Sequence, residues 1–175
     1  PYPKQWEREL TLGDGSTVLA RPVRPEDEAL YEAFFAKVEP NDLRLRFFTP
    51  KPDLSHRFLA RLTQIDYARA MAFAAIKPDT GELLGVVRIH ADPDHVSAEY
   101  AILVRSDLKG RGLGWALMQL IIDFARSDGL KDIQGEVLRR NVNMLAMCKE
   151  LGFARIMSHD DADVVSVKLL LEGTG

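Results

Sequence analysis

Three alternating glycines, Gly110, Gly112 and Gly114, constrain the fold of this chain more than any other sequence feature. They follow residues 98–104, whose apolar composition is typical of a buried strand. They lead into residues 113–127, where apolar side chains recur at helical spacing. Glycine leaves the backbone accessible, and the first N–H groups of a helix have no intrahelical acceptor. The sequence therefore predicts a strand, a loop and a helix in succession. A loop of this kind can hold a phosphate group.

The spacing of these glycines excludes two common nucleotide-binding loops. The phosphate loop of nucleoside triphosphatases ends in Gly-Lys-Ser or Gly-Lys-Thr, and no such sequence follows the glycines here. A dinucleotide-binding loop has the spacing G-x-G-x-x-G directly after a strand, whereas residues 105–109 intervene here and the spacing is G-x-G-x-G. From the glycines alone, a tight turn without any ligand stays an equal alternative.

The rest of the chain predicts one α/β domain with a mixed sheet, over residues 17–175. Residues 1–16 are polar and turn-rich, and they predict an N-terminal extension or linker that contains a hairpin turn at Gly13-Asp14-Gly15. Strands are expected at residues 17–22, 70–76, 83–89, 98–104, 132–138, 153–157 and 164–170. Helices are expected at residues 24–38, 41–48, 113–127 and 141–151, with a further helix capped by Ser55.

Two motifs together resemble the GNAT family of N-acetyltransferases. Residues 109–114 (KGRGLG) are similar to the family's pyrophosphate loop, [QR]-x-x-G-x-[GA], with Lys109 in place of the usual Gln or Arg. Residues 141–153 (NVNMLAMCKELGF) are similar to its closing motif, in which Asn precedes a helix that ends in Leu-Gly-Phe. The resemblance covers residues 18–170. It implies the GNAT fold, with a mixed, mainly antiparallel central sheet flanked by helices, and an enzyme that uses acetyl-CoA as co-substrate and no metal.

Within the family, three stretches are similar to bacterial protein lysine acetyltransferases of the Pat type: Tyr2-Pro3-x-x-Trp6, residues 42–48 (DLRLRFF) and residues 98–110 (AEYAILVRSDLKG). This likeness implies transfer of an acetyl group to the ε-amine of a protein lysine, on metabolic enzymes such as acyl-CoA synthetases. In such proteins the domain often follows a synthetase-like segment. The first residue, Pro1, is compatible with excision from a longer chain and equally with a trimmed terminus. Two alternatives stay open: acetylation of a small amine, and a non-catalytic domain that senses acyl-CoA.

The resemblance also implies where the cofactor lies. The pyrophosphate is expected on the glycine loop and the pantetheine along the preceding strand, where a backbone N–H would polarise the thioester carbonyl. Asn141 is expected beside the pantetheine arm. The cofactor-binding residues implied are Ile102, Leu103, Val104, Lys109, Gly110, Arg111, Gly112, Leu113, Gly114, Trp115 and Asn141.

Glu99 is the candidate general base, because the family often places a catalytic Glu at the start of the pantetheine-binding strand. A lysine ammonium has a pKa of about 10.4 and must lose a proton before it attacks. A carboxylate set among apolar residues is expected to have a raised pKa, which suits a base. The alternative is a solvated Glu at a strand end. Cys148 stands where many members have a proton-donating Tyr, and packing is its expected role.

Composition excludes several classes of function. The net charge is −3 and no basic face stands out, which argues against nucleic-acid binding. The longest apolar runs fall well short of the roughly 20 residues that span a bilayer. A single cysteine gives neither an internal disulfide nor a zinc cluster, and it fits a cytoplasmic protein. Arg44 and Arg46 lie among aromatic residues, and they either line the acceptor groove or pair at the surface.

Overall fold

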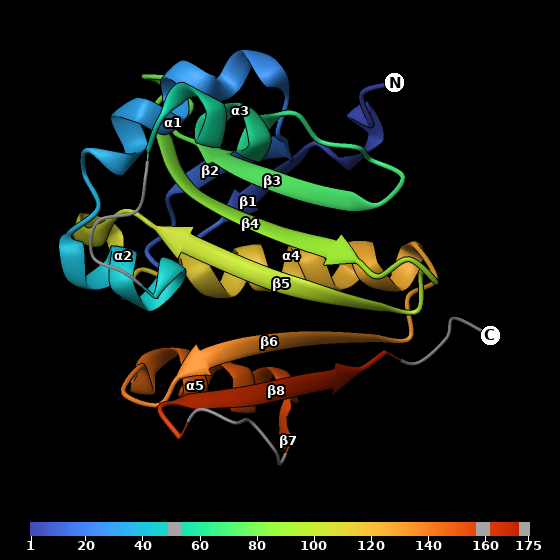
Figure 1. Ribbon diagram of the computed structural model, residues 1–175. Coiled ribbons are helices and arrows are strands. Elements are labelled where there is room, and N and C mark those ends of the chain that lie inside the picture. The colour runs from blue at the N-terminus through green and yellow to red at the C-terminus, as the bar shows by residue number, and fades with distance from the viewer. Residues whose placement is uncertain (49–53, 157–161, 172–175) are drawn as a thin grey trace.

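The computed structural model describes residues 1–48, 54–156 and 162–171, and in these it forms one eight-stranded sheet (Figure 1). The strand order is β1-β2-β3-β4-β5-β6-β8-β7, and every neighbouring pair is antiparallel except β5 and β6. The expected α/β class with a mixed, mainly antiparallel sheet is therefore confirmed. The strands are β1 (Arg8–Thr11), β2 (Thr17–Pro22), β3 (Ala70–Ile76), β4 (Leu83–Ala91), β5 (Ser97–Val104), β6 (Asp132–Leu138), β7 (Ala154–Ile156) and β8 (Val164–Leu170).

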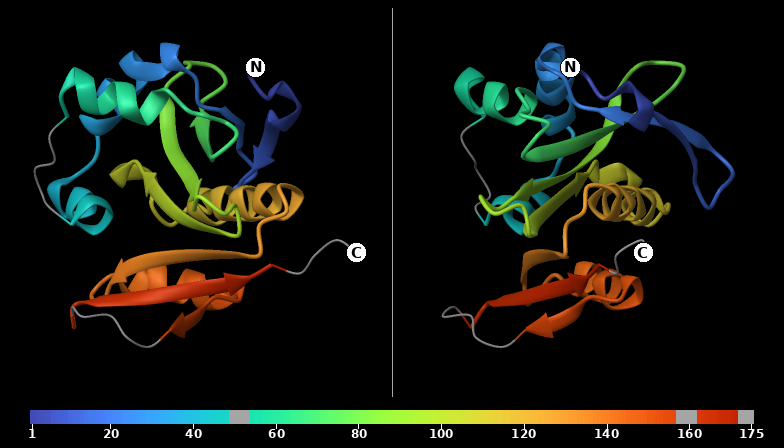
Figure 2. Two further views of the ribbon diagram at one scale, coloured as in Figure 1. Left: turned by 45° about the vertical axis from the view of Figure 1, so that its right-hand side comes forward. Right: turned by 90° about the vertical axis from the view of Figure 1, so that its right-hand side faces the viewer.

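Helices cover both faces of this sheet. They are α1 (Glu28–Phe35), α2 (Pro40–Phe47), α3 (His56–Thr63), α4 (Leu113–Ser127) and α5 (Val142–Leu151), with short 3-10 turns η1 (Lys4–Trp6), η2 (Pro25–Asp27) and η3 (Ser106–Leu108). The right-hand view of Figure 2 shows α1 and α3 on one side of the strands and α4 on the other. Alternate residues of β3, β4 and β5 point to the two faces, so each face has its own apolar core.

The parallel pairing of β5 with β6 is short, and a space opens between the two strands where the pairing ends. The two strands pair only from Ser97↔Asp132 to Glu99↔Gln134. Beyond this point β5 continues beside β4 to Val104, and β6 continues beside β8 to Leu138. Figure 1 shows β5 and β6 running apart toward the end that carries α2 and the start of α4.

A tyrosine ring lies where the two strands part. Tyr100 is the first residue of β5 beyond the paired section, and its ring lies over Gly135 of β6. A Cβ added at Gly135 would be 2.1 Å from Cε1 of Tyr100, so this position accepts no side chain while the ring is present. The ring also packs on Phe153, with 5.6 Å between the ring centroids. We infer that the Tyr100 ring keeps β5 and β6 apart at this point, and that the absence of a side chain at Gly135 leaves space for the ring.

Residues 1–16, which the sequence suggests as an extension or linker, contribute an edge strand to the sheet. β1 pairs with β2 through the expected hairpin turn, which the Leu12 N–H closes by donating to the Ser16 carbonyl. Trp6 packs edge-on against Phe124 of α4, with 5.2 Å between centroids. The aromatic side chain and the strand pairing explain why this polar segment is folded onto the rest.

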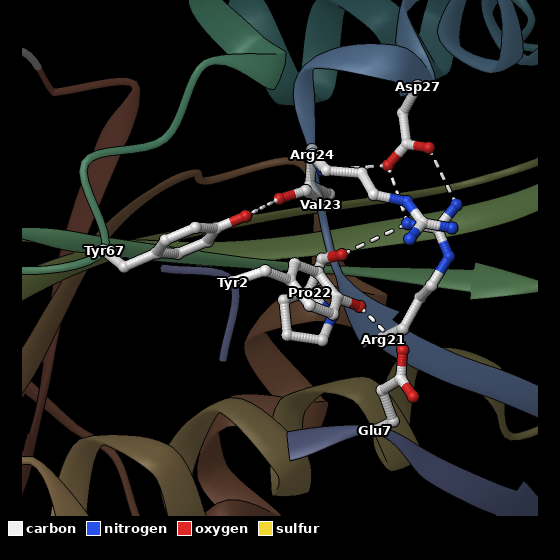
Figure 3. A network of polar contacts seen from close by, with 8 residues as sticks. All are labelled: Tyr2, Glu7, Arg21, Pro22, Val23, Arg24, Asp27 and Tyr67. Carbon is white, nitrogen blue, oxygen red and sulfur yellow. Dashed lines mark hydrogen bonds and ion pairs between the residues drawn. The ribbon is translucent and has the colours of Figure 1, made fainter. Parts of the chain in front are cut away.

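A buried ion pair ties the first helical turn to β2 (Figure 3). Arg21 donates two hydrogen bonds to the carboxylate of Asp27, at 2.7 and 2.8 Å, and both side chains are buried. Asp27 also accepts a hydrogen bond from the Arg24 N–H, which caps η2. Tyr67 donates to the Val23 carbonyl beside this pair. These contacts fix the entry into α1 on the edge of the sheet.

Several element boundaries differ from the expected ones. The first helical segment, expected over 24–38, is a 3-10 turn followed by α1, and it ends at Phe35. The second ends because Phe48 takes a left-handed conformation, with φ of 63°. Pro50, a residue that ends helices, follows this segment in the sequence but lies outside the described residues, as does the last residue of the strand expected at 153–157. Ser55 caps α3 as expected, because its Oγ accepts from the Phe58 N–H.

Candidate active site

A cavity of about 910 Å³ opens where β5 and β6 part. One wall is β5 from Glu99 to Val104, and the opposite wall is β6 at Glu136 and Val137. The glycine loop and the first turns of α5 close one end of the cavity, and α2 closes another side. Its volume lies at the upper end of the range of about 300–1,000 Å³ that is usual for ligand pockets, so a large cofactor fits here.

The expected pantetheine residues Ile102, Leu103 and Val104 all line this cavity. Their strand is paired with β4 on one side, while the side toward β6 has no strand partner beyond Glu99 in the described part of the chain. An exposed strand edge of this kind offers backbone N–H and C=O groups to an extended ligand with amide groups. Asn141 also lines the cavity, and its side chain caps α5 by accepting from the Met144 N–H.

The glycine loop has the backbone conformation that its composition requires. Gly110 and Gly112 have φ of 83° and 87°, which is a left-handed conformation that other residues adopt at a cost. Gly112 is the N-cap of α4, and the first intrahelical hydrogen bond is the one from Ala116 N–H to the Gly112 carbonyl. The N–H groups of residues 113–115 precede that bond, so they lie at the positive end of the helix dipole, where an anion is stabilised.

The sequence-predicted loop residues contribute to the cavity to different extents. Lys109, Gly110 and Gly114 line it, while Arg111, Gly112, Leu113 and Trp115 do not. The Leu113 side chain is fully buried in the core, so only its backbone is available to a ligand. Gly114 lies against α5, with its Cβ position 3.9 Å from the Met147 sulfur.

The ammonium of Lys109 is paired with Asp42 of α2, which is buried. Ser106, in the turn before the glycine loop, donates to the other oxygen of the same carboxylate and accepts from the Glu39 N–H. Lys109 therefore links the loop to α2. The sequence analysis missed the role of Asp42, because its partners lie more than 60 residues away along the chain.

Glu99 lies at the point where β5 and β6 stop pairing, and its side chain is exposed. It lines the main cavity and also a second cavity of about 740 Å³ that lies beside the β4–β5 turn. Its cross-strand neighbours are His90 of β4 and Gln134 of β6. The expectation that Glu99 sits among apolar residues is therefore wrong, because the strand neighbours on both sides are polar. A carboxylate here can be reached by a ligand from either cavity.

Two arginines line the main cavity together with Glu99; the sequence left the place of Arg46 undecided and did not point to Arg88. Arg46 comes from the last turn of α2, and Arg88 comes from β4, on the same face as His90. Burial, together with the positive charge of Arg88, lowers the pKa of Arg46 to about 10. Arg44, on the same helix, does not line the cavity and is exposed.

Cys148 is buried beneath the site and does not line the cavity. Its sulfur lies 3.2 Å from the hydroxyl of Tyr100. Burial raises the pKa of the Cys148 thiol and, more strongly, that of the Tyr100 hydroxyl, so both groups are protonated at neutral pH. The pair holds the tyrosine ring in place, which agrees with the packing role expected for Cys148.

Within the described residues, no group of three or more His, Cys, Asp or Glu side chains is arranged to bind a metal ion. None of the described helices is long and apolar enough to cross a membrane.

The splayed sheet, the glycine loop at the start of α4 and the cavity between them match a known family. Residues 37–153 match the acetyltransferase (GNAT) family, and the chain belongs to it. It is therefore an acyltransferase that uses acetyl-CoA as the donor of its acetyl group.

Three proteins similar to this chain are named acetyltransferases or contain a GNAT domain. An acetyltransferase of Pseudomonas aeruginosa is 33% identical over 92% of this chain and 88% of its own length. The crystal structure of the GNAT domain of Streptomyces lividans PAT has a TM-score of 0.90 and 30% identity, over 98% of this chain and all of that one. The acetyltransferase Pat of Mycolicibacterium smegmatis is 25% identical over 93% of this chain, which spans only 44% of the length of that relative.

Proposed function

We propose that this chain transfers the acetyl group of acetyl-CoA to the ε-amine of a protein lysine, with Glu99 as general base. The observation that carries this proposal is the position of Glu99, which lines both the cofactor-sized cavity and the second one. The likeness to PAT and Pat proteins supports a protein lysine as acceptor.

In this proposal the cofactor's pyrophosphate lies at the start of α4, on the N–H groups of residues 113–115. The pantetheine lies along the free edge of β5, where Ile102, Leu103 and Val104 offer backbone groups. This arrangement brings the thioester toward Glu99, at the closed end of the gap between the strands. A backbone N–H of β5 then stabilises the negative charge that develops on the carbonyl oxygen.

Glu99 takes a proton from the lysine ammonium, directly or through a water molecule. The free amine attacks the thioester carbonyl carbon, so a C–N bond forms and the C–S bond breaks, and the surplus proton on the nitrogen passes to the departing sulfur or to water. Coenzyme A leaves as a thiolate, whose pKa of about 8.5 makes it a tolerable leaving group without an enzymatic acid. Cys148 takes no part in this route, since it lies outside the cavity.

The proposal is tested by incubating the chain and acetyl-CoA with a panel of acyl-CoA synthetases and mapping acetylated residues by mass spectrometry. We expect acetylation confined to one active-site lysine of a synthetase. A parallel panel of small amines provides the contrasting outcome. Turnover only with small amines would replace the protein acceptor, and acetyl-CoA binding without any turnover would make the chain a sensing domain.

A further inference from the structure

Besides Lys109 and Arg140, the cavity that Glu99 lines has two arginines, Arg46 and Arg88, that the chemistry of acetyl transfer does not require. In the described residues, Arg46 makes neither an ion pair nor a hydrogen bond, and its guanidinium lies over the ring of Phe47, 4.4 Å from the centroid. Phe47 is itself fixed between Phe35 of α1 and Phe58 of α3. The contact with the Phe47 ring therefore orients the Arg46 guanidinium on the cavity wall.

Arg88 is already partly engaged, because its Nη2 donates to the Leu62 carbonyl at 2.6 Å. It still lines the cavity and adds a second positive charge next to Arg46. Glu99 is the carboxylate whose charge acts on Arg46, and it is diagonal to Arg88 across the β4–β5 pair. When Glu99 takes up the acceptor's proton, the two arginine charges lose this neighbouring carboxylate, while Asp42 stays paired with Lys109 elsewhere in the cavity lining. Such a site favours a ligand that brings an anion of its own.

Building on the function proposed above, we propose that the acceptor lysine is flanked by an acidic residue whose carboxylate binds Arg46. A guanidinium binds a planar carboxylate through two parallel hydrogen bonds, which gives both affinity and orientation. An acceptor with a second ammonium group, such as a polyamine or a lysine among basic residues, brings a like charge to Arg46 and Arg88 and is disfavoured.

The test compares three peptides that share one lysine and differ only in the flanking residues, which are Asp, Asn or Lys. The wild-type chain is expected to acetylate the Asp peptide with a kcat/KM at least about 10-fold above that of the Asn peptide, as one charge-assisted contact implies. The Lys peptide is expected to be the poorest. Free amino acids and polyamines are assayed in parallel as small-molecule acceptors.

Arg46→Gln is expected to abolish the difference between the Asp and Asn peptides by raising KM for the Asp peptide, while the Kd for acetyl-CoA is unchanged. Arg46→Lys keeps the charge and is expected to restore part of the preference. Arg44→Gln is the matched control, since Arg44 is exposed on the same helix and does not line the cavity. It is expected to behave as wild type.

Each outcome decides one point. Equal kcat/KM for the Asp and Asn peptides in the wild type overturns the acidic context. An equal fall in kcat on every peptide in Arg46→Gln also overturns it, because Arg46 would then act through Glu99. Weakened acetyl-CoA binding in that variant would assign Arg46 to the cofactor and overturn it too. Turnover of small amines without any peptide is a failure of the proposed protein acceptor, not of the anion site.

Discussion

At the scale of single residues, the proposed mechanism depends on Glu99. Glu99→Gln keeps the size and polarity of the side chain but removes the base. We expect kcat to fall about 100-fold or more, in line with the contribution of general base catalysis, while the Kd for acetyl-CoA is unchanged. Steady-state kinetics with a peptide acceptor and calorimetry with acetyl-CoA measure the two quantities. A normal kcat would remove Glu99 from the mechanism.

The contact between Gly135 and Tyr100 is a second position where a single substitution is informative. Gly135→Ala places a methyl group 2.1 Å from a ring carbon of Tyr100, so the ring or the strand must move. We expect the free energy of unfolding to fall by about 1–3 kcal/mol, as overpacking usually costs. Denaturant unfolding of Gly135→Ala, Tyr100→Ala and the double variant measures the coupling. Additive losses in the double variant would show that the ring and the glycine are independent.

From the sequence, a residue could be assigned to the candidate site only where it belongs to a local pattern or to a known motif. Glu99, the glycine loop and Asn141 follow from the resemblance, and the cavity wall at 102–104 follows from the strand that precedes the loop. The partners of Tyr100, Asp42 and Arg46 lie far away along the chain, and no local periodicity encodes such contacts. The exposed Glu99 agrees with the alternative of a solvated Glu at a strand end; the sequence could not decide between the two settings, because the outcome depends on where β5 and β6 separate.

At the scale of elements, the proposed binding of the pyrophosphate depends on the backbone conformation at the start of α4. Gly112 has φ of 87° at the N-cap, so Gly112→Ala is strained and turns the first N–H groups of the helix. We expect KM for acetyl-CoA to rise by about 10-fold, which corresponds to 1.4 kcal/mol. Kinetics at saturating acceptor measures this effect.

The matched control for that variant is Gly129→Ala at the other end of the same helix. Gly129 has φ of 80° and nothing within 4 Å of its Cβ position, so it has a similar backbone cost and no contact with the site. We expect lower thermal stability but an unchanged KM for acetyl-CoA. A similar rise in KM in both variants would mean that general destabilisation, rather than the loop, weakens binding.

The strands were the most predictable elements. Their expected bounds at 17–22, 70–76, 132–138 and 164–170 agree with the structure, because apolar β-rich runs lie between clear turn residues. Helical bounds before residue 64 were less accurate. There the 3-10 turn at η2 depends on the capping contact of Asp27, and the end of α2 depends on the left-handed Phe48.

At the scale of the whole molecule, stability depends on joining the N-terminal hairpin and α1 to the sheet. Asp27→Ala leaves the Arg21 guanidinium buried without its carboxylate. Removing one partner of a buried pair costs about 3–5 kcal/mol, and we expect a loss of this size in the free energy of unfolding. The combined variant Arg21→Met, Asp27→Leu is expected to recover most of it. A loss below about 1 kcal/mol for Asp27→Ala would contradict the role assigned to the pair.

Asp42 belongs to the helix that carries Arg46, yet its side-chain partners are Ser106 and Lys109, in and just before the glycine loop. In the proposed arrangement, a phosphate that binds this loop would compete with Asp42 for Lys109, and a shift of Lys109 would then move α2 and the acceptor side. We therefore expect a compulsory kinetic order in which the donor binds first. A lysine-free peptide analogue would then inhibit uncompetitively with respect to acetyl-CoA, and noncompetitive inhibition would indicate random binding. On this expectation, a single carboxylate, that of Asp42, sets the order in which the two substrates bind, donor before acceptor.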